Sequence, residues 1–152
     1  MILEPEMTMI DIRARSKKQV LEDIARGICQ HFQGRMDCTA MLNSLVSREN
    51  IGSTGIGGGV AIPHVRIKGL KKNSGVFVRL KTPVDFDSAD GQPVDLIYVL
   101  LASGENRGSA LMELSRVSNF FRNPEYCERL RACKDPFGSI HACNEEQARA
   151  AA

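Results

Sequence analysis

The chain has 152 residues, of which 43% are hydrophobic and 25% are charged, a composition typical of one globular domain with a buried core. Its 20 basic and 18 acidic residues nearly cancel, so charge gives no reason to expect nucleic acid or an anionic membrane as a partner. The first fifteen residues lack the apolar stretch of a signal peptide, and no apolar run is long enough to cross a bilayer. We therefore expect one cytoplasmic domain over residues 1–152, without membrane insertion.

The cysteines are five in number, and none forms a C-x-x-C pair. Their spacing fits neither a zinc site nor a small disulfide scaffold, so we expect free thiols in a reducing compartment. The five are Cys29, Cys38, Cys127, Cys133 and Cys143.

Two helices are predicted in the first third of the chain. Ser16 is a suitable N-cap for a helix whose apolar residues recur on one face. These residues are Val20, Leu21, Ile24, Ala25, Ile28 and Phe32. After a turn-prone stretch at residues 33–37, a shorter helix is expected to end at about Glu49. Its inward-facing residues are Met41, Leu42, Leu45 and Val46.

The sequence predicts β-strands in the middle of the chain. Glycine-rich residues 52–59 predict irregular backbone with access to positive φ angles, and residues 60–67 predict a strand that Pro63 interrupts. Strands are also predicted at 75–80 and 96–101. The second of these lacks polar alternation, which favours a central strand covered on both faces. Residues 81–94 are rich in Pro, Asp and Gly and predict a loop.

The last third is predicted to be helical. One helix follows from apolar residues at helical spacing, which are Ala110, Leu111, Leu114, Val117 and Phe121. A second begins at Pro124 and ends near Cys133. The tail from about Lys134 has few apolar residues and is expected to fray. Helices on both sides of a strand-rich middle predict an α/β fold with helices on both faces of a sheet.

The candidate chemistry lies in residues 52–64, Gly-Ser-Thr-Gly-Ile-Gly-Gly-Gly-Val-Ala-Ile-Pro-His. Two familiar phosphate motifs are excluded, because Val60 stands where a dinucleotide fingerprint needs glycine and Gly58 stands where a Walker A loop needs lysine. The backbone N–H groups of the glycines could still converge on an anion, since no side chain blocks close approach. A flexible connecting loop would explain the glycines alone.

His64, at the end of this segment, favours a functional site over a flexible connecting loop. It follows Pro63, which fixes its own φ and keeps Ile62 extended, so the imidazole is presented from rigid backbone. Arg66 lies two residues further on the same strand face, where its guanidinium would attract phosphoryl oxygens. These features suit a nucleophile, although a lone histidine near an arginine is more often structural. His31 and His141 have no other metal-ligating residues at a suitable spacing in the sequence.

The whole pattern resembles a specific family. Arg48-Glu49-Asn50, Gly52-Ser53-Thr54-Gly55-Ile56-Gly57 and Val60-Ala61-Ile62-Pro63-His64 resemble the active-site signature of the fructose, mannitol and nitrogen-regulatory enzyme IIA proteins of the bacterial phosphotransferase system. Segments 75–80, 82–87 and 92–96 resemble the nitrogen-regulatory branch most closely. The resemblance covers roughly residues 8–133 and implies a mixed β-sheet sandwiched between helices.

The resemblance also implies a function. It implies that His64 accepts a phosphoryl group at Nε2 from a small histidine phosphocarrier protein, with Arg48 as a second catalytic residue and no metal or organic cofactor. The nitrogen branch implies regulatory target proteins downstream. Phosphate-binding residues are expected in the loop and on the following strand: Ser53, Thr54, Gly55, Gly57, Gly58, Gly59 and Arg66.

One position departs from the family pattern. The family usually has a second histidine at the start of the helix that begins near Ser109, where this chain has Ala110. Ala110 cannot hydrogen-bond to His64 or to a phosphate. Ala110 therefore favours one alternative, a non-phosphorylated protein-interaction module of the same fold. A second alternative, independent of Ala110, is a sugar-specific enzyme IIA of a fructose or mannitol system. For a carrier, we expect His64 partly exposed in a shallow cleft, with Arg48 and residues 55–59 on its rim and apolar surface around it.

Overall fold

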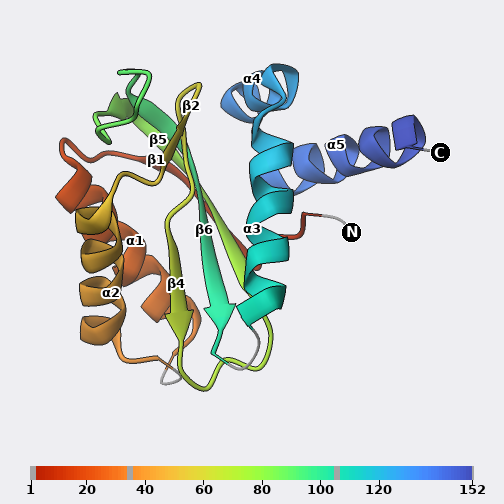
Figure 1. The fold of residues 1–152 in the computed structure, drawn as a ribbon. Coiled ribbons are helices and arrows are strands. Elements are labelled where there is room, and N and C mark those ends of the chain that lie inside the picture. Colours follow the sequence, from red (N-terminus) through yellow and green to blue (C-terminus); the bar gives the residue numbers. More distant parts are fainter. Residues whose placement is uncertain (1–2, 34–35, 105–106, 152) are drawn as a thin grey trace.

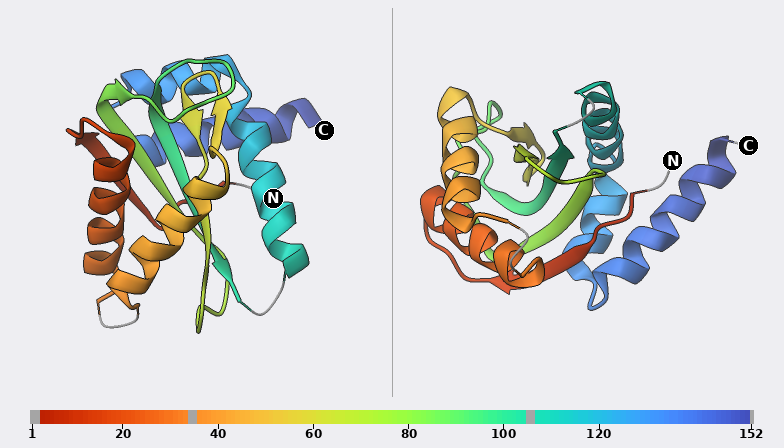
Figure 2. Two further views of the ribbon diagram at one scale, coloured as in Figure 1. Left: turned by 60° about the vertical axis from the view of Figure 1, so that its left-hand side comes forward. Right: turned by 90° about the horizontal axis from the view of Figure 1, so that it is seen from below.

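The computed structural model describes residues 3–33, 36–104 and 107–151. A mixed β-sheet lies between two groups of helices, with α1 and α2 on one face and α3 to α5 on the other (Figure 1; two further views in Figure 2). The strand order is β1-β5-β6-β3-β2, and β4 also pairs with β6. The predicted α/β architecture is confirmed. Within the described ranges, no helix is both long and apolar enough to cross a membrane.

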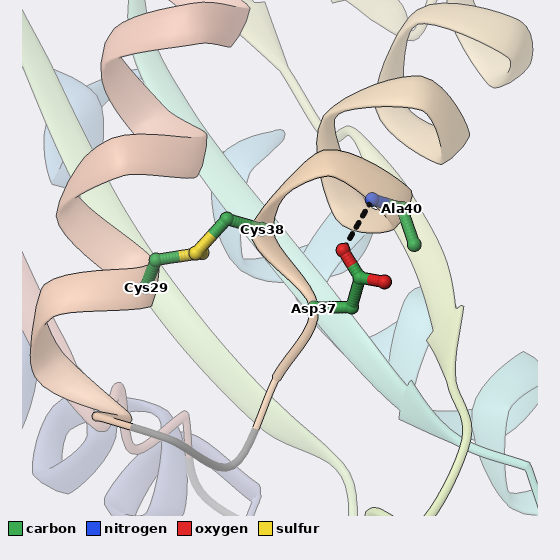
Figure 3. The surroundings of a disulfide bond; sticks show 4 residues. All are labelled: Cys29, Asp37, Cys38 and Ala40. Atoms are coloured by element: carbon green, nitrogen blue, oxygen red, sulfur yellow. Dashed lines mark hydrogen bonds between the residues drawn. A yellow bond between two sulfur atoms is a disulfide. The ribbon is translucent and has the colours of Figure 1, made fainter.

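The first two helices form as predicted. Helix α1 spans Lys17–His31, and Ser16 caps it by accepting a hydrogen bond from the Gln19 amide at 3.1 Å. Helix α2 spans Cys38–Ile51 and is capped in the same way by Asp37 (Figure 3). Both caps satisfy amides that the first turn of a helix leaves without partners.

The central strands are longer than predicted. Strand β5 spans Ser74–Val84 and so continues into the segment expected to be a loop. It pairs antiparallel with β6, Val94–Ser103, which is buried along almost its whole length. Strand β1, Met7–Ile12, was not predicted and pairs parallel with β5. Its burial is only partial, which explains its weak apolar signal.

The glycine-rich segment forms a hairpin, so the prediction of irregular backbone over residues 52–59 was wrong for residues 55–57. Strand β2 spans Gly55–Gly57 and pairs antiparallel with β3, Val60–Ala61. The turn between them needs positive φ, with values of 94°, 66° and 82° at Gly57, Gly58 and Gly59. Pro63 separates β3 from β4, His64–Ile67, as predicted, and both pair parallel with β6.

The C-terminal third contains α3 (Arg107–Phe121), α4 (Pro124–Ala132) and α5 (Pro136–Ala151). The expectation of a frayed tail is therefore wrong for residues 136–151. The tail is anchored because Ile140 and Cys143 are buried and the Asn144 side chain exchanges two hydrogen bonds with the Leu3 backbone, at 3.1 and 2.8 Å. This anchor joins two distant parts of the chain, so no local pattern could show it.

The sheet separates two hydrophobic cores. Val76, Val78 and Val99 face the core under α1 and α2, whereas Phe77 and Tyr98 face the core under α3 to α5. This alternation confirms that β6 is covered on both faces. Burial raises the pKa of the Tyr98 hydroxyl, with smaller contributions from nearby glutamates.

A disulfide corrects the prediction of five free thiols. Cys29, near the end of α1, is bonded to Cys38 at the start of α2, with 5.7 Å between their Cα atoms (Figure 3). The last turn of α1 lies beside the first turn of α2, which brings the two cysteines together, and their sequence spacing alone does not reveal this arrangement. Cys127, Cys133 and Cys143 are free, and burial raises the pKa of the Cys127 and Cys143 thiols.

Candidate functional site

His64 is the first residue of β4 and is half-buried. Its Nδ1 lies 3.0 Å from the carbonyl oxygen of Ile62. Because a carbonyl only accepts hydrogen bonds, Nδ1 carries the proton and Nε2 has the free lone pair. That lone pair accepts a hydrogen bond from Arg48 Nε at 3.2 Å. The imidazole is thus held at both nitrogens, with Nε2 ready to act as a nucleophile.

Arg48 comes from the last turn of α2. Its Nη1 also donates to the Gly52 carbonyl at 2.8 Å, which fixes the plane of the guanidinium beside the imidazole. A planar guanidinium has five N–H donors and stays charged at any relevant pH. Such a cation can donate hydrogen bonds to an anionic group placed beside Nε2.

Glu49, the next residue of α2, is a buried carboxylate with only 7% of its surface exposed. It accepts hydrogen bonds from the Thr54 amide, at 2.9 and 3.1 Å, and from the Thr54 hydroxyl. Lys17 Nζ lies 3.6 Å away and balances the charge. The Thr54 carbonyl accepts the Ile62 amide at 2.9 Å, and Ile62 holds His64. A continuous path of hydrogen bonds therefore joins Glu49 to the imidazole.

Sequence reasoning gave Glu49 no role. Its only signal was its place in the Arg48-Glu49-Asn50 segment, because its burial depends on how the end of α2 meets the following loop. The two hydroxyls that were predicted to bind phosphate already have partners. The Thr54 hydroxyl donates to Glu49, and the Ser53 hydroxyl donates to the Phe86 carbonyl and accepts the Gly55 amide at 3.0 Å. Both hydroxyls fix the loop, and their contact with phosphate stays a prediction.

A cavity of about 320 Å³ opens beside the imidazole. Its walls come from β4, β6 and α3. The lining residues are His64, Val65, Arg66, Leu100, Ala102, Ala110, Leu111 and Leu114. Arg66 is exposed and lines the cavity together with His64, as its spacing on the strand predicted. Ala110 stands in the wall facing this space, and its methyl group offers no hydrogen bond.

The hairpin glycines do not line this cavity. The Gly58 amide donates to Asp90 Oδ2 at 2.9 Å, and its carbonyl accepts Arg131 Nη2 at 2.8 Å. Arg131 is in turn paired with Asp95. The amides of Gly58 and Gln92 hold the pKa of the Asp90 carboxyl below its usual range. The anion at this turn is thus a side chain of the protein itself, and phosphate binding by the glycines stays a prediction.

Apolar side chains are exposed near the site. Leu111 lines the His64 cavity with 70% of its surface exposed, and Met112 follows it with 59%. Ile51 ends α2 with 84% exposed, next to the Gly52 carbonyl that Arg48 contacts. Exposed apolar side chains of this size are typical of surfaces that bind another protein.

The chain is similar to known proteins over most of its length. The family model for the phosphoenolpyruvate-dependent sugar phosphotransferase system, EIIA 2, matches residues 1–142. A nitrogen regulatory protein of Bradyrhizobium diazoefficiens is 37% identical over 134 residues, covering 88% of this chain and 86% of that protein. A nitrogen regulatory protein of Escherichia coli K12 is 36% identical over 134 residues, covering 88% of this chain and 81% of that protein.

Solved structures show the same fold. The nitrogen regulatory protein IIA-Ntr from Neisseria meningitidis superposes with a TM-score of 0.80 at 31% identity, covering 90% of this chain and 92% of that one. IIA mannitol from Escherichia coli shares the fold with a TM-score of 0.71 at 15% identity, covering 90% and 94%.

Proposed function

The chain belongs to the EIIA 2 family of the phosphoenolpyruvate-dependent sugar phosphotransferase system, and from this premise we propose that it carries a phosphoryl group on Nε2 of His64. The observation that supports this most directly is the pair of contacts on the imidazole. Nδ1 is committed to the Ile62 carbonyl, and the Nε2 lone pair points to the Arg48 guanidinium. The site thus has a nucleophile and a cation in contact.

The proposed donor is a small histidine phosphocarrier protein. The Nε2 lone pair of His64 forms a bond to phosphorus while the nitrogen–phosphorus bond of the donor breaks, and its electron pair returns to the donor imidazole. The Nδ1 proton stays in place, where the Ile62 carbonyl stabilises the positive charge that develops on the ring. Arg48 and Arg66 offset the negative charge on the transferring group. No metal or organic cofactor takes part in this step.

We propose a regulatory role in the cytoplasm, because relatives that match over most of their length, such as those of Bradyrhizobium diazoefficiens and Escherichia coli K12, are nitrogen regulatory proteins. A phosphoryl group would add about −1.5 to −2 charges at a half-buried position surrounded by exposed apolar side chains. Such a change is large enough to create or abolish docking of a regulatory target protein. No contact with nucleic acid or insertion into a membrane is part of this proposal.

The test is phosphoryl uptake from a phosphorylated carrier protein, followed by the mass of the intact chain. Wild type should gain one phosphoryl group, and His64→Ala should gain none. His31→Ala and His141→Ala are matched controls, because both histidines lie on exposed helix positions near single glutamates, and both variants should be labelled like wild type. If His64→Ala is labelled as fast as wild type, the assignment of the site is wrong.

A second function, a protein-interaction module that is not phosphorylated, is favoured by Ala110. This residue leaves the wall opposite His64 without a hydrogen-bond donor for a phosphoryl group. The two functions are separated by comparing wild type with Ala110→His. Labelling of Ala110→His at His64, while wild type stays unmodified, would establish the interaction module for the natural chain.

A further inference from the structure

The Cys29–Cys38 disulfide borders a cavity unrelated to His64. Both cysteines line a space of about 560 Å³ between α1 and α2, with Glu22 and Arg26 in its wall. This volume lies within the usual range of small-molecule sites. Solvent-borne reagents can therefore reach the sulfur atoms.

The two sulfur atoms have different surroundings. Cys38 is exposed and is the first residue of α2, directly after the N-cap Asp37, whose carboxylate accepts a hydrogen bond from the Ala40 amide. Arg26 adds positive charge in the same cavity, although Asp23 is paired with it at 3.1 Å. Cys29 is half-buried in the last turns of α1. Cys38 is thus the accessible nucleophile, and Cys29 is placed to resolve a bond formed there.

We propose that Cys29 and Cys38 are a redox-active pair that exchanges with a small zwitterionic peptide thiol of the glutathione type. The carboxylates and the ammonium group of such a peptide match the opposite charges of Arg26 and Glu22 in the cavity wall. Disulfides in reducing compartments are generally transient and serve catalysis or redox sensing. This inference does not depend on the phosphorylation of His64.

The exchange balances as a two-electron reaction. In oxidation, the Cys38 thiolate attacks one sulfur of the small disulfide, which forms a mixed disulfide on Cys38 and releases the first thiolate. The Cys29 thiol loses its proton to solvent and attacks Cys38 Sγ, which closes the protein disulfide and releases the second thiolate. The protein dithiol is oxidised, and the small disulfide is reduced to two thiols. Reduction by excess thiol follows the reverse path.

The experiment places the whole chain in buffers with graded ratios of reduced to oxidised glutathione, blocks free thiols by alkylation and measures the intact mass. As the ratio of reduced to oxidised glutathione falls, Cys29 and Cys38 of the wild type should form their disulfide and become resistant to alkylation together. Cys29→Ser should trap one glutathionyl group on Cys38, and Cys38→Ser should be modified at least about tenfold more slowly because Cys29 is less exposed. Cys133→Ser, which alters a free cysteine elsewhere in the fold, is the matched control and should titrate like wild type.

Three outcomes would overturn the proposal. Wild type could keep its disulfide in the most reducing buffer, which would show that the bond is a structural disulfide that does not exchange. It could keep both thiols in the most oxidising buffer, which would exclude exchange. Equal rates of glutathionylation in Cys29→Ser and Cys38→Ser would refute the assigned order of attack. Phosphoryl uptake by the same samples is an independent measurement, so failure of this proposal can be told apart from failure of the proposed function.

Discussion

The carboxylate of Glu49 accepts hydrogen bonds from both the amide and the hydroxyl of Thr54. Through Ile62 this pair reaches Nδ1 of His64, whereas Arg48, the residue before Glu49, contacts Nε2 directly. One turn of α2 therefore fixes both edges of the imidazole. The orientation of the proposed nucleophile depends on how this helix ends.

Replacement of Glu49 should destabilise the protein. Glu49→Ala leaves the buried Thr54 amide and hydroxyl without acceptors, and we expect the free energy of unfolding in urea to fall by about 2–4 kcal/mol. Glu49→Gln keeps one acceptor oxygen and should lose less. The control Glu145→Ala, on the exposed side of α5, should stay within about 0.5 kcal/mol of wild type. Equal losses in the two Glu49 variants would contradict the role given to the carboxylate.

Substitution of Arg48 should slow phosphoryl uptake without unfolding the protein. Arg48→Ala removes the cation beside Nε2, and we expect the uptake rate to fall about 10- to 100-fold. Arg48→Lys keeps the positive charge but loses the planar guanidinium, which contacts His64 and Gly52 at the same time. Its uptake rate should therefore lie between the rates of wild type and Arg48→Ala. The measurement is the time course of intact mass, and the exposed Arg122→Ala is the control. A wild-type rate in Arg48→Ala would remove this arginine from the mechanism.

The Ala110 position allows a test by gain of function. Ala110→His places a second imidazole in the wall of the His64 cavity, where it can donate to the transferring phosphoryl group. One charge-assisted hydrogen bond is worth roughly 1.5–3 kcal/mol, and the lower end corresponds to about a tenfold faster uptake. Ala110→Leu is the matched control, because it fills the same space without a donor and should not accelerate transfer. Equal acceleration by leucine would show that filling the cavity, not hydrogen bonding, is responsible.

Acid should weaken the hairpin through Asp90. The amides of Gly58 and Gln92 hold the pKa of this exposed carboxyl below 3.8 in the folded state, so its ionised form favours folding. That contribution is complete above the pKa of the unfolded chain and is lost as pH falls through the lower folded-state pKa. Asp90→Asn, which resembles the protonated acid, should therefore be less stable than wild type at pH 7 and approach it below pH 3.8. Urea unfolding across this range gives both curves, and a constant difference between them would refute the assignment.

Local signals predicted much of the fold. Ser16 and the apolar face of α1 lie within a few turns of helix, and the uninterrupted apolar run of β6 identified the central strand without knowledge of its neighbours. Strand β1 was missed because it is stabilised by β5, which lies more than sixty residues further along the chain. The α5 anchor on Leu3 and the Cys29–Cys38 bond also depend on contacts that form only after folding.

At the site, too, contacts between distant residues could not be predicted from the sequence. The family pattern identified His64 and Arg48, and strand spacing identified Arg66; in the structure Arg48 contacts His64, and Arg66 lines the same cavity as His64. Nothing in the sequence indicated that the Thr54 hydroxyl donates a hydrogen bond to Glu49, because this contact requires the loop to fold back on the end of α2. Glycines suggested an anion site, yet the turn they form is held by Asp90 from another loop.

The hydrogen bonds between Leu3 and Asn144 hold the beginning of the described chain against α5. Figure 1 shows α5 on the same side of the sheet as α3, with α1 and α2 on the other side. Leu3 and Ala151, which are the first and last described residues, therefore belong to the same flank, because Leu3 is bonded to the helix that Ala151 ends. Immobilisation through either terminus should leave the flank of α2, which carries Arg48, free for a binding partner. For the same reason, removal of Leu3 should loosen α5, because Asn144 would lose both hydrogen bonds.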